Sequence, residues 1–364
     1  MAEKLKNIAI VYGGKSTEHE VSVRSARNIY TAIDRQRFTP ILIGVDKDGK
    51  WILKDEDEFL KQDIVIFKEK NQLAVIPGKN KNQIVYLNNI SQSFNIDAVF
   101  PIIHGTGGED GTIQGLIKTL NIPFVGTGVL GSSVCLDKEL TKRLLNEAKI
   151  PNSKFKSYLA NEKSIIDYNQ LKYDLGLPMY IKPPNLGSSV GISKVHNENE
   201  FNQAIDLAFR FDRKVLIEES IEGREIECAI IGNEDIKASL PGEVLTIGEN
   251  HEFYSYDAKY TDANGSVTVI PADVTAQEIE AIKEIAIKTY KCLNCEGMAR
   301  VDVFLQSDGE VLVNEVNTIP GFTDISMYPK LWKANGISYP DLITELINLA
   351  IERHKTEALM QTSI

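Results

Sequence analysis

A predicted β-hairpin close to the C-terminal end constrains the fold more than any other stretch of the chain. Two runs rich in apolar residues, 299–305 and 311–316, flank the turn sequence Ser-Asp-Gly-Glu. An Asp-Gly pair between such runs is a strong hairpin signal, because both central residues of a two-residue loop need positive φ. We therefore expect a two-residue loop at Asp308-Gly309, with Ser307 paired with Glu310.

This register places four polar side chains on one face of the hairpin. Directly opposed residues on neighbouring strands share a face, and side chains alternate between faces along each strand. Asp302 then lies opposite Glu315. The polar face carries Arg300, Asp302, Glu315 and Asn317, whereas the other face carries Ala299, Val301 and Val303.

The opposed carboxylates of this face indicate a cation site. Two facing carboxylates destabilise a strand pair, and a hard cation between them removes that penalty. An oxygen-only set of Asp, Glu and Asn suits Mg²⁺ or Mn²⁺. A solvated polar face on an edge hairpin explains the same residues about equally well, so the residues alone leave both interpretations open. In the loop that follows, Gly321 allows backbone N–H groups to approach a ligand closely.

The composition predicts an acidic protein with two or three domains. The chain has 364 residues, 43% of them hydrophobic, and a net charge of −11. This length supports a large core. The acidic balance argues against nucleic acid or an anionic membrane as the main partner.

The cysteines and the N-terminal sequence favour a reduced, cytoplasmic protein. Four cysteines in a chain of this length do not make a disulfide framework. The Cys292–Cys295 spacing lacks a second pair, or nearby histidines, to complete a zinc site. The N-terminal apolar run is too short for a signal peptide, and no segment reaches the length of a membrane span.

The first 103 residues predict a parallel α/β sheet. The sequence has a βαβ pattern: an apolar run at 7–12, a Gly-Gly turn, a helical segment at 22–33 and a second apolar run at 39–45. The turn lacks the GxGxxG fingerprint of dinucleotide-binding proteins. Glu18 lies just ahead of the helix, where the helix dipole favours a carboxylate, and an ordinary first-turn acid is the default interpretation. After an uninformative excursion at 51–95, a strand at 96–103 leads to His104, which is either a ligand contact or a structural histidine.

The middle of the chain predicts a helix and a glycine-rich loop between two strands. Residues 132–148 are expected to form one helix with Leu136, Leu140 and Leu144 on its apolar face and Lys138 off it. A strand at 179–182 ends at Lys182 and runs into PPNLGSSVG, whose N–H groups and serines could fold over phosphate oxygens. A plain hairpin connection is the alternative.

The rest of the chain predicts antiparallel strands, a long loop and two helices. Strands are expected at 215–219, 225–230 and 239–247, and helices at 275–291 and 340–353. The polar and aromatic stretch 248–266 is expected to be a lid or disordered, because structureless loops of that length are uncommon in compact proteins.

Eight motifs in this order resemble those of the D-alanine–D-alanine ligases, a family of the ATP-grasp superfamily. They are GGKSTEHEVS, HGTGGEDGTIQG, the helix with Leu136-Asp137-Lys138, YIKPPNLGSSVG, VLIEE followed by Glu225, DAKY, ARVDVF and NEVNTIPGFT. Each motif is weak alone, but eight in register are highly specific. The resemblance runs from Ile8 to about Leu346 and omits only 51–95 and the C-terminal tail.

The resemblance implies a fold of three domains. An N-terminal parallel α/β domain (1–126) would bind substrate. A central ATP-grasp domain (127–217) and a C-terminal catalytic domain (218–364) would be α+β, with antiparallel sheets that sandwich ATP. The family also implies a homodimer formed through the first domain.

The resemblance also implies residues for ATP and metal binding. Phosphate contacts match Lys138, Lys182 and Lys259, and the loop over the phosphates matches Gly187, Ser188 and Ser189. Adenine contacts match Glu218 and Glu219, the ribose contact matches Glu225, and further nucleotide contacts match Asn314 and Glu315. The ligands of two Mg²⁺ (or Mn²⁺) ions match Asp302, Glu315 and Asn317, with Glu315 bridging them.

The implied reaction joins two D-alanine molecules, for peptidoglycan precursor synthesis, through an acyl phosphate formed from ATP. Catalysis would depend mainly on positioning and on charge neutralisation. Oxyanion donors match Arg300 and the N–H of Gly321, and the first D-alanine subsite matches Glu18 and His104. The carboxylate site of the second substrate matches Ser326 and Met327, and a lid-closing triad matches Glu18, Ser188 and Tyr260.

Three other functions compete with this prediction. A relative that joins D-alanine to D-lactate or D-serine is the nearest, although Tyr260 in DAKY resembles the dipeptide-forming members. A non-catalytic nucleotide-binding protein has no need of Arg300. A nicotinamide dehydrogenase is disfavoured by the missing GxGxxG.

Overall fold

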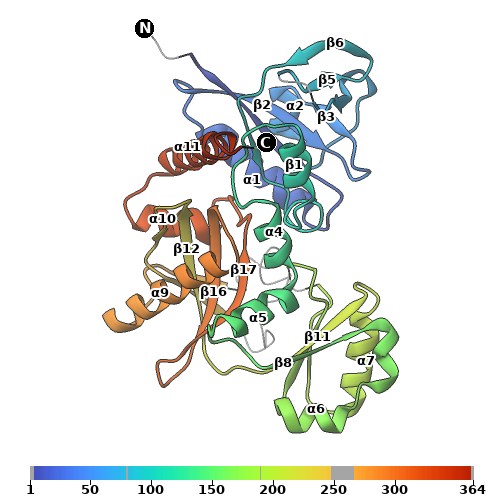
Figure 1. Cartoon of the computed structure of the whole chain (residues 1–364), viewed down its shortest axis with the longest axis vertical. Coiled ribbons are helices and arrows are strands. Elements are labelled where there is room, and N and C mark those ends of the chain that lie inside the picture. Colours follow the sequence, from blue (N-terminus) through green and yellow to red (C-terminus); the bar gives the residue numbers. More distant parts are fainter. Residues whose placement is uncertain (1–3, 79–80, 189, 247–265, 362–364) are drawn as a thin grey trace.

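The computed structural model describes residues 4–78, 81–188, 190–246 and 266–361. Three sheet-containing units follow one another along the chain, and Figure 1 shows the first at one end of the long axis and the second at the other. The third sheet and the helices beside it lie between them. The predicted fold, one parallel α/β unit and two units with antiparallel sheets, is confirmed.

The first sheet has the strand order β3-β2-β1-β7. Its strands are β1 (Lys6–Gly13), β2 (Phe38–Val45), β7 (Ala98–Pro101) and the antiparallel edge strand β3 (Trp51–Leu53). Ile8 and Ile10 of β1 pack in the same core as Ile29 of α1 (His19–Ala32), whereas Val11 packs with Ile113 of α3 (Thr112–Thr119). Both faces of β1 are covered, which explains its continuous apolar sequence.

The excursion after β3 is an ordered addition to this unit. It contains a short helix, a 3₁₀ turn and a separate antiparallel sheet: α2 (Glu56–Lys61), η1 (Glu69–Asn71), β4 (Leu73–Val75), β5 (Ile84–Tyr86) and β6 (Asn89–Phe94). Leu73 and Ile84 pack in the same core as Val11. The excursion therefore extends the core of the first unit.

The second sheet is antiparallel and has the order β10-β9-β11-β8. Its strands are β8 (Phe155–Leu159), β9 (Met179–Lys182), β10 (Ser193–Val195) and β11 (Lys214–Glu219), and its helical segments are η2 (Ala160–Ile165), α6 (Tyr168–Leu175) and α7 (Glu198–Ala208). Ile181 and Ile217 pack with the two helices on one face. The proposed domain boundary between residues 217 and 218 falls inside β11, so a division after Glu219 follows the sheets better.

The third sheet has six strands among the described residues and carries the hairpin. Its strands are β12 (Arg224–Gly232), β13 (Lys237–Ala238), β14 (Gly242–Thr246), β15 (Ser266–Val269), β16 (Gly297–Leu305) and β17 (Val311–Asn317). Helix α9 (Ala276–Cys292) begins with a capping box at Thr275 and packs on the face that carries Val301 and Val303. The polar face of the hairpin is thereby turned away from α9.

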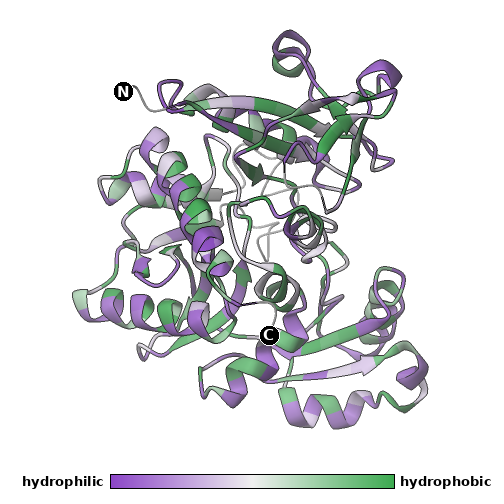
Figure 2. Ribbon diagram, turned by 45° about the horizontal axis from the view of Figure 1, so that its top comes forward, coloured by the Kyte–Doolittle hydropathy of each residue, from purple (hydrophilic) through white to green (hydrophobic). Residues whose placement is uncertain are grey.

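The last two helices connect the third unit to the first. Helix α10 (Met327–Ala334) packs on β12, and α11 (Tyr339–Ala358) packs on α1, β7 and β16. Buried Arg353 of α11 donates to the carbonyls of Phe124 (2.8 Å) and Gly126 (2.6 Å). Figure 2 shows hydrophilic and hydrophobic residues alternating along the helices, as expected of helices with one buried side. Among the described helices, none is long and apolar enough to cross a membrane.

The predicted helix at 132–148 is wrong in two respects. The chain forms two helices there, α4 (Val129–Leu136) and α5 (Lys138–Glu147), because the Asp137 side chain accepts from the N–H groups of Glu139 and Leu140 and starts a new helix. The predicted apolar face is also wrong. Leu140 and Leu144 are 37% and 39% exposed, whereas Lys138 is buried.

The predicted hairpin loop is wrong, but the functional register is right. Gln306 N–H donates to Glu310 O (2.9 Å) and Gly309 N–H donates to Gln306 O (3.0 Å), so the loop has three residues and Ser307 does not pair with Glu310. Gly309 has a φ of +88°, whereas Asp308 is not among the described residues with positive φ. The extra loop residue shifts the strand pairing by one residue, and an irregularity between Asp302 and Val303 restores the predicted pairing. Asp302 therefore faces Glu315, and Arg300 faces Asn317, as predicted.

Candidate active site

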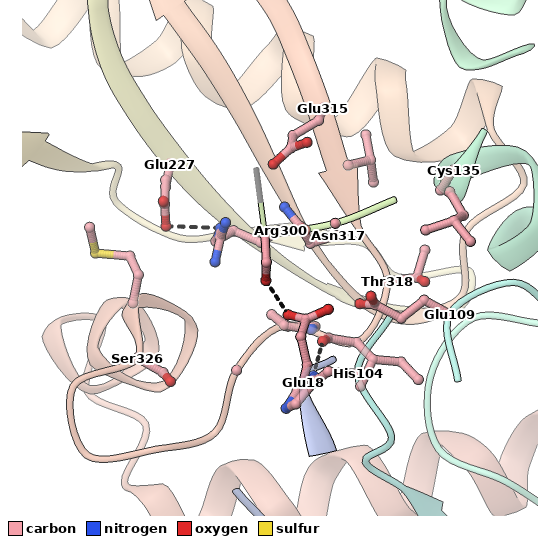
Figure 3. Close-up of a pocket in the computed structure, with 18 of the residues that line it drawn as sticks. Glu18, His104, Glu109, Cys135, Glu227, Arg300, Glu315, Asn317, Thr318 and Ser326 are labelled. Carbon is pink, nitrogen blue, oxygen red and sulfur yellow. Dashed lines mark hydrogen bonds and ion pairs between the residues drawn. The ribbon is translucent and has the colours of Figure 1, made fainter. Parts of the chain in front are cut away.

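A single pocket collects residues from all three units (Figure 3). Its walls come from the start of α1, the loop after β7, the end of α4 and the start of α5. Gly187 and Ser188 of the glycine-rich loop, strands β12, β14, β15, β16 and β17, and the segment 318–327 complete them. The predicted site residues in these walls are Glu18, His104, Lys138, Gly187, Ser188, Arg300, Glu315, Asn317, Gly321, Ser326 and Met327. Residues more than 300 positions apart in the chain thus meet at one place.

Arg300 is held between two carboxylates on the polar face of the third sheet. Its guanidinium donates to both oxygens of Asp302 at 2.7 Å, and its Nε lies 2.8 Å from Glu227 Oε2. Asn317 Nδ2 also donates to Asp302, at 3.0 Å. Burial would lower the pKa of Arg300, but Asp302 and Glu227 outweigh it and raise that pKa, so the guanidinium stays charged.

Sequence reasoning missed Glu227. This residue lies on β12 directly opposite Asp302, so its side chain shares the polar face of the hairpin. Its signal was present in the sequence, because Glu225 and Glu227 alternate with apolar residues in an otherwise buried strand. Figure 3 shows Arg300 directed toward Glu227, with Glu18 and Glu109 on another side of the pocket.

Lys138 links the hairpin to the glycine-rich loop. Its Nζ donates to the carbonyl of Leu186 (3.0 Å) and lies 3.4 Å from Glu315 Oε2. The side chain is buried at the start of α5, where Asp137 caps the helix. Lys138 therefore presents a positive charge to the pocket beside a carboxylate of β17.

Glu18 and Ser188 join the first unit to the glycine-rich loop. The Ser188 hydroxyl donates to Glu18 Oε1, although 170 residues separate the two. Glu18 is the N-cap residue of α1, but its side chain makes no capping hydrogen bond and accepts from Ser188. The third member of the predicted triad, Tyr260, lies outside the described residues, as do Ser189 and Lys259.

His104 holds the loop that contains Gly321. Its Nδ1 lies 3.1 Å from the carbonyl of Ile319, and its Nε2 lies 3.0 Å from the Ser25 hydroxyl, whose oxygen also accepts from Phe322 N–H. Burial lowers the pKa of His104, so the ring is neutral. A neutral ring with both nitrogens engaged fits the structural alternative, although His104 also borders the pocket.

Gly321 and Ser326 lie close together in the same segment. A Cβ at Gly321 would approach Ser326 Oγ to 2.6 Å, so a side chain at this position would force the Ser326 hydroxyl to shift. Ser326 Oγ accepts from Thr323 N–H (2.9 Å) and lies 2.8 Å from the Thr323 hydroxyl. Met327, which follows, begins α10 and is buried.

Six of the predicted residues that the structure describes lie outside the walls of this pocket: Lys182, Glu218, Glu219, Glu225, Asp302 and Asn314. Lys182 and Glu218 form an ion pair on the second sheet. Burial would raise the pKa of Glu218, but Lys142 and Lys182 outweigh it and lower the pKa to about 2. Glu219 accepts from the N–H of Lys154 at 2.7 Å.

The polar face of the hairpin fits a hard divalent cation in the chemistry of its donors. Asp302 and Glu315 are directly opposed, and Asn317 adds an amide, so the set offers only oxygen ligands once the amide presents its oxygen. Only two members of this set are carboxylates. This agrees with the finding that, among the described residues, no group of three or more His, Cys, Asp or Glu side chains is arranged as a metal site. A cation here would share the Asp302 carboxylate with Arg300.

Comparison with known proteins decides the family. Residues 7–127 match the family described as D-ala D-ala ligase N-terminus, and residues 144–348 match D-ala D-ala ligase C-terminus. The chain belongs to the D-alanine–D-alanine ligase family. The predicted family and its ATP-dependent ligase activity are thus supported over nearly the whole chain.

Individual relatives of this ligase agree with that assignment. The D-alanine–D-alanine ligase of Oceanobacillus iheyensis is 50% identical over 363 residues, which cover 98% of both chains. The structure of the D-alanine–D-alanine ligase from Coxiella burnetii has a TM-score of 0.85 at 36% identity and covers 98% of this chain and 97% of its own. The VanG D-Ala:D-Ser ligase from Enterococcus faecalis has a TM-score of 0.83 at 34% identity, over 95% of this chain and 100% of its own.

Glu109 is a second residue of the ligase pocket that the sequence prediction missed. Its Oε2 accepts from the N–H of Gly105 at 2.8 Å. Burial, together with the nearby negative charge of Glu18, raises the pKa of Glu109 from 4.5 to about 8. The motif HGTGGEDG contains Glu109, but its glycines indicate a loop that binds through its backbone and do not single out this side chain.

We predict that Glu109→Gln changes the pH dependence of stability. A carboxyl whose pKa is raised on folding stabilises the fold below its unfolded pKa, and this contribution is lost as the pH rises through about 8. The melting temperature of the wild type, measured by calorimetry, should therefore fall relative to that of the variant between about pH 5 and about pH 9. Exposed Glu222→Gln serves as the control. A Glu109→Gln difference that does not vary with pH would contradict the assigned shift.

Proposed function

We propose that this ligase joins two D-alanine molecules in the pocket of Figure 3, with conversion of ATP to ADP and phosphate. The observation that carries the proposal is the position of Arg300. It lies in one pocket with Glu18, Lys138, Ser188 and Gly321, which come from all three units. A protein that only bound nucleotide would have no need of a charged guanidinium beside a glycine loop in that place.

In the first step, the carboxylate of one D-alanine attacks the γ-phosphate of ATP, and ADP leaves. Lys138 and Lys182 supply positive charge to the phosphates, and the loop at Gly187 and Ser188 covers them. Glu218, Glu219, Glu225 and Asn314, none of them in the pocket wall, bind the nucleotide. Ser189 and Lys259 complete the phosphate contacts.

In the second step, the amine of another D-alanine loses a proton and attacks the carbonyl of the acyl phosphate. The carbonyl oxygen gains negative charge, and phosphate then leaves as the peptide bond forms. Arg300 and the N–H of Gly321 stabilise that oxygen, because fixed donors there need no reorganisation during the reaction. The pairs with Asp302 and Glu227 keep the Arg300 side chain in position.

The two substrates occupy different sides of the pocket. The Glu18 carboxylate accepts a hydrogen bond from the ammonium of the first D-alanine. His104 contributes by positioning the neighbouring loop through the carbonyl of Ile319. Ser326 and Met327 lie at the carboxylate of the second substrate. Glu18, Ser188 and Tyr260 form the connection that closes the site and excludes water from the acyl phosphate.

Asp302, Glu315 and Asn317 would hold two Mg²⁺ or Mn²⁺ ions. Such ions, when bound, supply additional positive charge beside the phosphates. Asp302 and Glu315 provide carboxylate oxygens from opposite strands, and the Asn317 amide provides a neutral oxygen. We further propose a homodimer in the cytoplasm and a role in making peptidoglycan precursors.

The second substrate distinguishes this proposal from its nearest alternative. We predict ADP release that depends on ATP, a divalent cation and D-alanine, with D-alanyl-D-alanine identified by mass spectrometry. D-lactate should yield little product at neutral pH, and D-serine is included because the VanG D-Ala:D-Ser ligase is structurally similar. Preferential formation of a product with D-lactate or D-serine would contradict the proposed specificity.

Replacing Arg300 tests its role in the second step. Arg300→Met should lower kcat by about 10²–10³-fold, because an oxyanion donor contributes on this order. Binding of ATP, measured by calorimetry, should remain close to that of the wild type. Exposed Arg210→Met is the matched control and should retain full activity. Wild-type kcat in a folded Arg300→Met variant would refute the oxyanion role.

A further inference from the structure

A buried cluster of charges lies behind the proposed phosphate-binding lysine of the second sheet. Lys182 on β9 and Glu218 on β11 project from the same sheet face, because Lys182 pairs with Leu216 and Glu218 is two residues further on. The opposite face, with Ile181 and Ile217, packs against α6 and α7. Lys142 of α5 reaches Glu218 on the Lys182 side.

The two oxygens of Glu218 are divided between the two lysines. Oε2 contacts Lys182. Oε1 lies 2.6 Å from Lys142 Nζ and accepts from the Ser153 hydroxyl at 3.1 Å. Lys142 also donates to Ser153 Oγ at 2.7 Å, so its ammonium is fixed by two partners.

Lys142 is less accessible to a nucleotide than Lys182. Its side chain is 1% exposed, whereas that of Lys182 is 10% exposed. Burial lowers the pKa of Lys142, whereas its contact with Glu218 favours the charged ammonium. With both lysines protonated, Lys142 and Lys182 carry two positive charges and Glu218 one negative charge. One lysine therefore neutralises Glu218, and the positive charge of the other remains available to an anion.

We propose that Lys142 is a positioning residue that keeps Glu218 neutralised, so that Lys182 can turn toward the phosphates of ATP. The inference rests on the proposed role of Lys182 in ATP binding. Without Lys142, Lys182 would be the ammonium left to neutralise the Glu218 carboxylate, and Glu218 is only 3% exposed. Moving Lys182 to a phosphate would then leave a buried charge unpaired, which is strongly unfavourable.

A double-mutant cycle between Lys142 and Glu218 tests this role. Lys142→Met should raise KM for ATP by about tenfold, with kcat within about threefold of the wild type and KM for D-alanine unchanged. In the Glu218→Gln background, the same Lys142→Met change should raise KM for ATP by less than about twofold, because no buried carboxylate then competes for Lys182. Equal increases in both backgrounds, or no increase in either, overturn the proposal.

Two further variants keep the test decisive. As a control, Arg224→Met removes a different ion pair, between exposed Arg224 and buried Glu243, and should leave KM for ATP within about twofold of the wild type. If Lys142→Met does not fold, Ser153→Ala keeps all three charges and loses only the hydrogen bonds that align them. It should raise KM for ATP by about twofold to threefold and leave KM for D-alanine unchanged, and an unchanged KM for ATP would overturn the proposal.

Calorimetric titration with ATP separates this inference from the proposed function. If the wild type released no ADP with D-alanine, the ligase proposal would fail. The coupling between Lys142 and Glu218 would still be measurable in the affinity for ATP. Normal ligase activity without that coupling would overturn the role of Lys142 alone.

Discussion

The paired charges around Arg300 are the interaction on which the rest of the site depends. Arg300, Asp302 and Glu227 lie on one face of a sheet whose other face is the apolar core under α9. A shift of the hairpin by one residue would exchange its faces and bury Arg300, Asp302 and Glu315 in that core. The apolar packing of Val301 and Val303 therefore also fixes the direction of the guanidinium.

The same principle recurs on the second sheet. Lys182 and Glu218 share a face there, and Lys142 and Ser153 complete their contacts from outside the sheet. Both sheets thus use one face for the core and the other for paired charges. Burial strengthens each pair, and it makes any unpaired member costly, so each pair holds its side chains in defined positions.

The sequence predicted the register of the hairpin better than its loop. An Asp-Gly pair indicates a two-residue turn, but only the glycine adopts positive φ, and the extra loop residue is compensated by the irregularity beyond Asp302. The helix at 132–148 was mispredicted because leucine spacing was given more weight than Asp137, whose side chain starts a new helix. Glu109 and Lys142 were missed because their importance arises from Glu18 and Glu218, which are distant in the chain and which local patterns do not identify. Glu227 was missed although its alternation with apolar residues in β12 is a local pattern.

The proposed function requires the polar face of the hairpin to bind the metal–nucleotide complex. Water proton relaxation of Mn²⁺–ATP tests it most directly, because the signal reports the bound ion itself. We expect strong enhancement with the wild-type protein, an affinity for Mn²⁺–ATP weakened by about tenfold or more in Glu315→Gln, and no change in Glu310→Gln at the exposed loop. Wild-type affinity for Mn²⁺–ATP in Glu315→Gln would show that the hairpin does not hold the ion through Glu315.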